Sequence, residues 1–192
     1  SAPRFERALR ESLGYRGPEL LAAALDAVAP GRRFDSALDL GCGTGLMAPL
    51  LRRLLRPGGR LTGLDLSPAM LAQARRSGLY DALLGGELVA HLAAAPERHD
   101  LIVAADVLAY LGALAPMLAG VARCLLPGGL FAATLELHAG EGVRLQSTQR
   151  YAHGEAWLRT TLAAAGLRAL RLVQASARHE GGQPVPGPEP GA

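Results

Sequence analysis

Apolar and polar positions along the chain follow two patterns, short apolar runs and amphipathic stretches with helical spacing. The apolar runs predict strands at Ala37–Leu40, Arg60–Leu64, Ala82–Leu84, Leu101–Ala105 and Leu130–Leu137. The amphipathic stretches between them predict helices at Gly45–Leu55, Pro68–Ser77, Leu88–Ala94 and Leu111–Leu125. Strands that alternate with helices predict an α/β fold of Rossmann-like type, a doubly wound, mostly parallel sheet with helices on both faces.

The two ends of the chain add further elements. Helices are predicted near the start at Arg4–Leu13 and Pro18–Val28. After the fifth strand we expect a loop at His138–Tyr151, a helix at Gly154–Ala165 and a strand at Leu167–Arg178. The predicted organisation is therefore N-terminal helices that cover the site (1–30), a main domain (31–180) and a disordered Pro/Gly-rich tail (181–192).

Length, charge and composition bear on which kinds of partner the protein can have. With 192 residues and a net charge of +3, the chain suits one domain with a sizeable core. The chain has no lysine, and its arginines occur singly or in pairs without forming a cluster, so we expect no nucleic-acid partner. No apolar run approaches the roughly 20 residues of a membrane span, and the first residues are charged where a signal peptide is apolar. We therefore expect a soluble cytoplasmic protein without a membrane partner. Cys42 and Cys124 lack metal-ligand spacing, so we expect no metal.

A glycine-rich turn follows the first strand, in the stretch LDLGCGTGLMAPLLRR. Its glycines, Gly41, Gly43 and Gly45, are spaced by two, and Leu46 stands where the dinucleotide fingerprint G-x-G-x-x-G has its third glycine. No Gly-Lys-Ser/Thr of a phosphate-binding loop follows. A backbone that approaches a ligand needs residues without a Cβ. Asp39, just ahead of the turn, is a candidate to hold an ammonium group, with bracing of the turn as the alternative role.

This D-x-G-x-G-x-G turn resembles the first motif of the class I S-adenosylmethionine-dependent methyltransferases. At the end of the second strand, about 20 residues past the turn, Asp65 can accept hydrogen bonds from both ribose hydroxyls of an adenosine. The resemblance implies S-adenosylmethionine as cofactor and S-adenosylhomocysteine as product. The predicted cofactor-binding residues are Asp39, Gly41, Cys42, Gly43, Thr44, Gly45, Asp65, Leu66, Met70, Glu87, Leu88, Ala104, Ala105 and Asp106. Among them, Glu87 is expected near the adenine amine, with a solvated helix-start glutamate as the alternative.

Four longer stretches of the sequence indicate one subgroup of this family. GYRGPELL, GLYDALL, DLIVAADVLAYLG and RYAHGEAWLRTTLAAAG resemble bacterial tetratricopeptide-repeat-containing methyltransferases, and the likeness runs from about Tyr15 to Gln183. That subgroup carries helical repeats ahead of the methyltransferase domain, so we expect helical repeats or a protein partner to close the acceptor site. The family's sheet ends in an antiparallel strand beside the fifth. The corresponding stretch here, PGPEPGA, cannot form a strand, so either this strand is missing or the C-terminus is truncated or altered.

Methyl transfer from a sulfonium releases a neutral thioether, so a base is needed only where the acceptor must lose a proton. Candidates near the expected methyl position are Asp106, Tyr110, Glu136 and His138. His138 is the first choice as base, with a surface-loop histidine as the alternative. The acceptor, a small molecule or a protein, is not encoded. ADVL after the fourth strand lacks the Asn/Asp-Pro-Pro-aromatic motif of DNA amino-methylating enzymes.

Three other functions remain open. The first is a regulatory or scaffold module that binds S-adenosylmethionine without turnover. The second is an NAD-dependent oxidoreductase, against which Leu46 argues. The third is another reaction at the same cofactor, such as aminopropyl transfer from its decarboxylated form.

Overall fold

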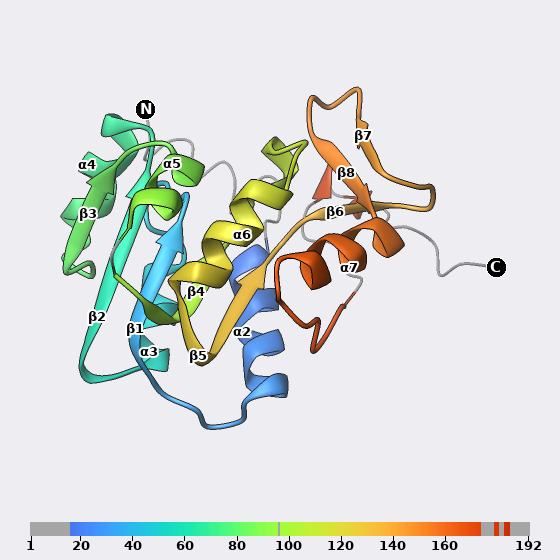
Figure 1. The fold of residues 1–192 in the computed structure, drawn as a ribbon. Coiled ribbons are helices and arrows are strands. Elements are labelled where there is room, and N and C mark those ends of the chain that lie inside the picture. The colour runs from blue at the N-terminus through green and yellow to red at the C-terminus, as the bar shows by residue number, and fades with distance from the viewer. Residues whose placement is uncertain (1–15, 96, 174–178, 181–182, 185–192) are drawn as a thin grey trace.

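A five-stranded parallel sheet forms the centre of the protein in the computed structural model, which describes residues 16–95, 97–173, 179–180 and 183–184 (Figure 1). Its strands are β1 (Phe34–Leu40), β2 (Leu55–Asp65), β3 (Ala82–Gly85), β4 (His99–Ala104) and β5 (Leu125–Ala133). They lie in the order β3-β2-β1-β4-β5, and every neighbouring pair is parallel. The predicted doubly wound α/β fold is confirmed.

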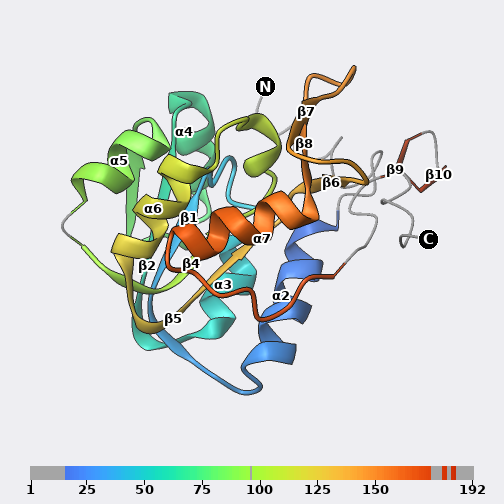
Figure 2. The ribbon, with the colours of Figure 1, turned by 45° about the vertical axis from the view of Figure 1, so that its right-hand side comes forward.

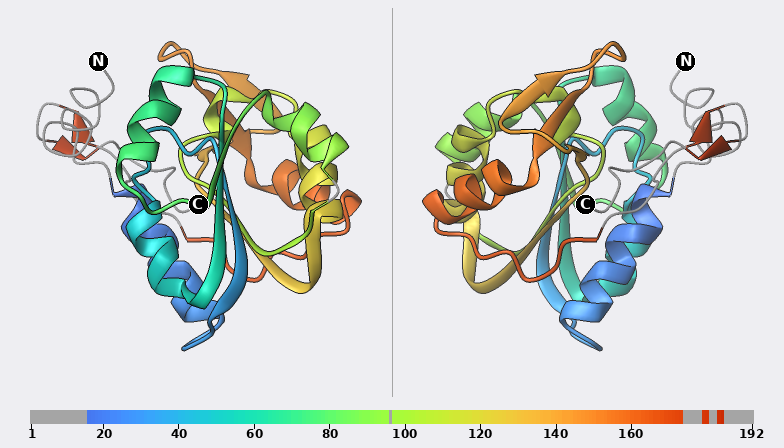
Figure 3. Two further views of the ribbon diagram at one scale, coloured as in Figure 1. Left: turned by 90° about the vertical axis from the view of Figure 1, so that its left-hand side faces the viewer. Right: turned by 90° about the vertical axis from the view of Figure 1, so that its right-hand side faces the viewer.

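Helices cover both faces of this sheet. They are α2 (Gly17–Val28), α3 (Ala48–Leu54), α4 (Pro68–Arg76), α5 (Leu88–Ala94), α6 (Ala115–Cys124) and α7 (Glu155–Ala164), with a short 3-10 helix η2 (Leu108–Tyr110). Figure 3 shows α2, α3 and α4 on one face and α5, α6 and α7 on the other. In the described part of the chain, no helix is both long and apolar enough to cross a membrane.

Two apolar clusters, one on each face, explain why the strands are apolar throughout. Leu38 and Ile102 point into the cluster under α5, α6 and α7, whereas Ala37, Leu101 and Val103 point into the cluster under α2 and α3. Successive residues of a strand face opposite sides of a sheet, so a strand covered on both faces needs apolar residues at nearly every position. This is why near-continuous apolar runs predicted the sheet.

The starts of β2 and β5 differ from the prediction. Both strands begin earlier than expected, at Leu55 and Leu125, directly after a helix. Each passes through a Pro-Gly-Gly turn in which Gly58 or Gly128 has a positive φ. Glycine adopts this conformation without strain, so the chain turns sharply from helix into strand. The predicted helix at 111–125 is correspondingly shorter, as α6, and η2 lies ahead of that range.

The predicted loop at 138–151 is wrong. This region belongs to a second, three-stranded sheet of β6 (Glu136–His138), β7 (Val143–Leu145) and β8 (Tyr151–Gly154), in the order β6-β8-β7. β6 pairs with β8 in parallel and β7 pairs with β8 antiparallel. The three strands are too short to show an apolar period, and the residues of β7 are exposed. The predicted fifth strand therefore ends at Ala133, and its last residues belong to β6.

The predicted strand at 167–178 is wrong over residues 167–173, which form no strand. This segment crosses from α7 past β5 toward α2 (Figure 2) instead of running along β5, so it has no ladder to join. Residues 174–178 lie outside the described residues, as does the predicted helix at Arg4–Leu13. Two short strands, β9 (His179–Glu180) and β10 (Gln183–Pro184), pair antiparallel with one another. Within the described residues the central sheet thus ends at β5.

Candidate functional site

The candidate site lies at the carboxyl ends of the parallel strands β1, β2 and β4 (Figure 1). In the turn after β1, Gly41, Gly43 and Gly45 all have a positive φ. A Cβ on Gly41 would lie 2.5 Å from Val107 Cγ2, and a Cβ on Gly45 would lie 3.2 Å from the Tyr80 ring. A Cβ on Gly43 would meet nothing within 4 Å. Packing therefore requires glycine at the first and third positions, whereas the middle one leaves its backbone open to a ligand.

Asp39 supports this turn from inside the protein. Its side chain is buried and accepts a 2.6 Å hydrogen bond from the Tyr80 hydroxyl. Burial raises the pKa of Asp39 to about 7; the Tyr80 hydrogen bond lowers this pKa and the nearby Asp65 carboxylate raises it. Burial likewise raises the pKa of the Tyr80 hydroxyl, so the phenol keeps its proton. The geometry matches the alternative role, bracing the turn; binding of an ammonium group stays a prediction.

Asp65 ends β2 and is held by two backbone donors. Its Oδ2 accepts a hydrogen bond from the Gly43 N–H at 2.9 Å, and its Oδ1 accepts one from the Ser67 N–H at 2.8 Å. Leu66 is 71% exposed and presents an apolar surface at the same strand end. Met70 lies in the first turn of α4 and donates its N–H to the Ser67 hydroxyl. The Asp65 carboxylate therefore has a fixed position beside the open glycine.

Glu87 and Leu88 have local roles at the start of α5. The Glu87 carboxylate accepts hydrogen bonds from the N–H groups of Val89 at 3.0 Å and Ala90 at 2.8 Å, which lower its pKa. It is therefore the N-cap of the helix. Leu88 packs against the apolar cluster under α5 and α6. Contact of either residue with an adenine stays a prediction.

The chain leaves β4 through a strained residue. After the buried Ala104 and the half-buried Ala105, Asp106 has a φ of 59°, which is uncommon outside glycine. Its N–H donates a 2.7 Å hydrogen bond to the Thr134 hydroxyl, and its carboxylate accepts one of 2.6 Å from Arg150. Such strain costs roughly 1–3 kcal/mol and persists only where neighbours enforce it. These contacts from two other elements fix Asp106 at the strand end.

Arg150 brings three of the predicted catalytic residues together. Its guanidinium donates to the carboxylates of Asp106 and Glu136 and, at 3.0 Å, to the Tyr110 hydroxyl. Its Cζ lies 5.1 Å from the centre of the Tyr110 ring. Burial lowers the pKa of Arg150, but the two ion pairs outweigh burial and raise it overall. The Gln146 amide also donates to Glu136. Arg150 thereby links β6 and the segment before β8 to the end of β4.

His138 has partners for both ring nitrogens within the second sheet. Its Nε2 lies 3.0 Å from the Gly142 carbonyl oxygen, and its Nδ1 accepts a 3.0 Å hydrogen bond from the Gly140 N–H. The imidazole therefore braces the turn between β6 and β7. The role of His138 as a general base stays a prediction, and it requires this turn to open.

Other polar residues near the site are buried, and contact of Cys42 or Thr44 with the cofactor stays a prediction. His153 is buried in β8 with its Nε2 3.0 Å from the Leu111 carbonyl oxygen, and burial lowers its pKa. Thr44 is buried within the glycine turn. Cys42 and Cys124 are buried, and burial raises the pKa of both thiols. Neither cysteine is therefore an activated nucleophile at neutral pH.

The residues around the turn fit a ligand with positive charge and no phosphate. Three acidic residues lie at or near the carboxyl ends of β1, β2 and β4, namely Asp39, Asp65 and Asp106. A pyrophosphate would face these acids, and the Gly43 N–H that could bind it already donates to Asp65. S-adenosylmethionine offers an ammonium, a sulfonium and two ribose hydroxyls, which carboxylates bind. Fold and site together define the class as a Rossmann-like α/β domain with an open glycine turn and acidic residues at the ligand edge of its sheet.

Comparisons with known proteins place the domain in a family. Residues 38–131 match the family model described as a methyltransferase domain. This part of the chain is a methyltransferase domain of the class I S-adenosylmethionine-dependent family. Membership of the tetratricopeptide-repeat-containing subgroup stays a prediction.

Individual relatives agree with this placement. A malonyl-[acyl-carrier protein] O-methyltransferase of Enterobacter lignolyticus is 36% identical over 59% of this chain and 43% of its own length. A trans-aconitate 2-methyltransferase of Methylobacterium nodulans is 40% identical over 58% of this chain and 41% of its own. The chain thus spans about two-fifths of the length of these relatives. A solved S-adenosylmethionine-dependent methyltransferase from Clostridium acetobutylicum shares the fold, with a TM-score of 0.69, 18% identity, and coverage of 91% of this chain and 89% of that one.

Two residues of the site were not found from the sequence. Tyr80 contacts Asp39 from 41 positions away, and Arg150 contacts Asp106 from 44 positions away. The only signal for Tyr80 was its place in the GLYDALL stretch, two residues before the third predicted strand. The only signal for Arg150 was its place at the start of the RYAHGEAWLRTTLAAAG stretch, because it follows an irregular segment that has no period.

Proposed function

We propose that this chain transfers the methyl group of S-adenosylmethionine to an acceptor by in-line displacement. The observation that carries the proposal is an open glycine beside a fixed carboxylate: Gly43 has free space where a Cβ would stand, and its N–H holds Asp65 in place. This arrangement supports an adenosyl group lying across the turn with its ribose hydroxyls on Asp65. The relatives named as methyltransferases support the reaction type.

The contribution of the chain to the reaction is binding and orientation. When bound, S-adenosylmethionine supplies a methyl group on a sulfonium, and the leaving thioether needs no proton. Asp65 would hold the ribose end, and the glycine turn would approach the methionine end through its backbone. Orientation of this kind contributes up to roughly 7–11 kcal/mol of barrier lowering in favourable cases.

We further propose that the acceptor atom needs no proton removed by the protein. Asp106, Glu136 and Tyr110 all contact Arg150, and both ring nitrogens of His138 have partners. A carboxylate oxygen is ionised at neutral pH and can attack a methyl group directly. An oxygen acceptor also agrees with the name of one relative, an O-methyltransferase. We also propose that a protein segment or partner, such as a helical-repeat array, closes the acceptor side of the site.

The proposal is tested by measuring which acceptors are methylated and how the rate of methylation depends on pH. The protein is incubated with S-adenosylmethionine and matched acceptors that carry a carboxylate, a phenol or an amine, and S-adenosylhomocysteine and methylated product are quantified by mass spectrometry. We expect product with carboxylate acceptors at a rate that is flat above about pH 6, because carboxylates are ionised there. Product from amines alone, with a rate that rises with pH, would contradict the choice of acceptor. Bound cofactor without any product would favour the regulatory module.

A further inference from the structure

The Tyr110 hydroxyl has a defined role as a hydrogen-bond donor at the ligand edge of the central sheet. Its oxygen lies 3.0 Å from Nη1 of Arg150. A guanidinium has donors and no acceptor, so the phenol oxygen accepts this hydrogen bond. Among the described residues this is the only hydrogen bond that the hydroxyl makes. Its single proton is therefore left to donate to a ligand.

Exposure and the neighbouring cation favour such a contact. Tyr110 is 58% exposed, whereas only 13% of the Arg150 side chain is exposed. The Arg150 Cζ also lies 5.1 Å from the centre of the Tyr110 ring, so the cation covers one face of the ring. A hydroxyl that accepts from a cation becomes a stronger donor, because linked hydrogen bonds polarise one another. The Tyr110 O–H is thus an accessible donor with a positive charge behind it.

Tyr110 lies across the glycine turn from Asp65. β1 lies between β2 and β4 in the sheet. Asp65 ends β2, whereas Tyr110 ends η2, the short helix after β4. Between these two strand ends, Val107 packs against the turn at Gly41. With the ribose on Asp65, as proposed above, the acceptor would stand on the Tyr110 side of the turn.

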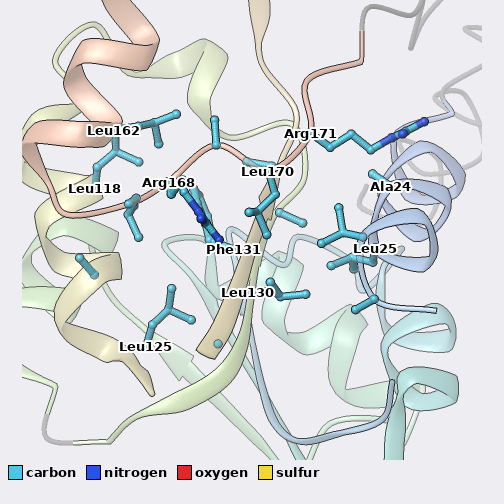
Figure 4. Close-up of a pocket in the computed structure, with 18 of the residues that line it drawn as sticks. Ala24, Leu25, Leu118, Leu125, Leu130, Phe131, Leu162, Arg168, Leu170 and Arg171 are labelled. Carbon is cyan, nitrogen blue, oxygen red and sulfur yellow. The ribbon is translucent and has the colours of Figure 1, made fainter. Parts of the chain in front are cut away.

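A groove of about 750 Å³ beside β5 is a separate feature (Figure 4). Its walls come from α2, with Leu25, and from α6 and α7, with Leu118 and Leu162. Neither Tyr110 nor Arg150 lines it. A ligand that the Tyr110 hydroxyl binds therefore lies at the strand ends and not in this groove.

The chemistry of a donor limits what Tyr110 can bind. An O–H group needs a lone pair on its partner, which a carboxylate oxygen offers and a protonated amine lacks. Hydrogen bonds to a charged oxygen are also stronger than those to a neutral one. A carboxylate is therefore the ligand that this hydroxyl fits best, in agreement with the acceptor proposed above.

The charges around Tyr110 are compatible with an anionic ligand. Two acids, Asp106 and Glu136, share the Arg150 cation. A second cation, the exposed Arg144 on β7, lies in the same row of the second sheet as Glu136, because both residues pair with one position of β8. These two acids are thus matched by two arginines, and a carboxylate that approaches Tyr110 does not meet them unpaired.

We propose, resting on the carboxylate acceptor of the proposed function, that Tyr110 binds and orients this carboxylate. Its O–H donates to one carboxylate oxygen, and the other oxygen attacks the methyl group. The attack forms the bond between oxygen and methyl carbon and breaks the bond between methyl carbon and sulfur, whose electron pair stays on the sulfur. No proton moves, so Tyr110 acts as a donor and not as the base considered from the sequence.

Tyr110→Phe keeps the ring and removes the proposed donor. Methylation of hexanoate and benzoate is measured with this variant, with the wild-type protein and with the control Tyr151→Phe, whose ring packs against Gly112. We expect kcat/KM to fall at least about tenfold in Tyr110→Phe, because a hydrogen bond to a charged group is lost. The loss should lie mainly in KM, since the carboxylate carries more negative charge before the attack than during it. Tyr151→Phe should match the wild type.

Binding measurements separate this inference from the proposed reaction. Protein saturated with S-adenosylhomocysteine is titrated with hexanoate in a calorimeter. We expect Tyr110→Phe to bind hexanoate at least about tenfold more weakly, with an unchanged affinity for S-adenosylhomocysteine, which shows that the variant is folded. If hexanoate binding depends on Tyr110 but no methyl ester forms, the inference stands and the proposed reaction fails. If esters form equally well in all three proteins, the reaction stands and the inference fails.

A double-mutant cycle tests whether Arg150 positions the hydroxyl. In Arg150→Met the Tyr110 oxygen loses its donor, and the Asp106 and Glu136 carboxylates compete for its proton. Part of the effect of Arg150→Met on hexanoate binding then acts through the hydroxyl. We therefore expect a smaller loss of affinity in the Tyr110→Phe background than in the wild-type background. Additive losses would overturn the positioning role of Arg150.

Three results would overturn the role of Tyr110 itself. The first is an equal kcat/KM for hexanoate in Tyr110→Phe and Tyr151→Phe. The second is a loss of the same size for the amines hexylamine and benzylamine, whose protonated forms cannot accept a hydrogen bond. The third is absence of hexanoate binding to the saturated wild-type protein at up to about 10 mM.

Discussion

The hydroxyl of Tyr80 lies 2.6 Å from the buried carboxylate of Asp39, beneath the glycine turn. The Tyr80 ring also fills the space that a Cβ on Gly45 or Gly63 would need, at 3.2 and 2.8 Å. A single side chain that precedes β3 therefore contacts the acid of β1, the turn after β1 and the backbone of β2. We infer that Tyr80 sets the shape of the turn and thereby the place of the open Gly43.

Tyr80→Phe keeps the ring and removes the hydrogen bond to Asp39. We expect the free energy of unfolding to fall by about 1.5–3 kcal/mol, because a buried carboxyl group loses its donor. Urea unfolding measures this change. The matched control is Tyr110→Phe, since Tyr110 is 58% exposed and water can replace its contacts. Equal losses in both variants would show that the Tyr80 hydroxyl does not support the turn.

Asp39→Asn should change the pH dependence of stability. The pKa of Asp39 is about 7 in the folded protein, against an ordinary value of 3.8. Between these values the folded state keeps a proton that the unfolded state has lost, so this group lowers stability as pH rises to about 7 and has no further effect above it. The asparagine variant lacks this titration.

The expected readout is a difference between two unfolding curves. From about pH 4 to about pH 7, wild type should lose on the order of 4 kcal/mol relative to Asp39→Asn, and the difference should then level off. Urea unfolding of both proteins at matched pH values measures it, and titrating groups that do not interact with Asp39 cancel in the comparison. Parallel curves across this range would contradict the raised pKa.

The glycine turn allows a matched pair of substitutions. Gly41→Ala and Gly43→Ala both place a Cβ on a residue with positive φ, but only the first places it against Val107. We expect Gly41→Ala to lose about 1–3 kcal/mol more stability than Gly43→Ala, because the core must shift. Gly43→Ala should instead weaken cofactor binding, because its Cβ occupies the open space. Urea unfolding and calorimetry separate the two effects, and a reversed pattern would place the ligand elsewhere.

Arg150→Met leaves two partly buried carboxylates, Asp106 and Glu136, without their shared cation. We expect a loss of roughly 1–3 kcal/mol in the free energy of unfolding, because breaking a partly buried ion pair leaves charges uncompensated. Arg159→Met is the control, since its pair with Glu155 is exposed and contributes about 0.5 kcal/mol or less. Adding Asp106→Asn to Arg150→Met should recover part of the loss. Additive losses in that double variant would exclude the proposed role.

Local signals in the sequence were sufficient for the central sheet and for the acidic residue at the end of its second strand. The apolar runs predicted every strand of the central sheet, and Ser67 followed by Pro68 marked the start of α4, where the Ser67 hydroxyl accepts the Met70 N–H. Asp65 was expected at a strand end and lies there. These features depend on neighbours in sequence or on the period of one element.

Contacts between distant segments were not predictable in the same way. The pairs Tyr80 with Asp39 and Arg150 with Asp106 join segments more than forty positions apart, and neither Tyr80 nor Arg150 lies in a helix or strand. The second sheet was missed because its strands are short and lie partly exposed. The segment 167–173 after α7 has residues typical of a strand but forms none. A strand also needs a neighbouring strand to pair with, and the period of one segment does not show whether such a neighbour is in reach.

The most direct test of the account is calorimetric titration of the protein with S-adenosylmethionine, S-adenosylhomocysteine and NAD, beside Asp65→Ala. We predict that both adenosyl ligands bind, that NAD does not, and that the variant binds them at least about tenfold more weakly, because hydrogen bonds to a charged group are lost. Absence of binding by either adenosyl ligand to the wild-type protein, or unchanged affinity in Asp65→Ala, would contradict the assignment of this strand edge as the cofactor site.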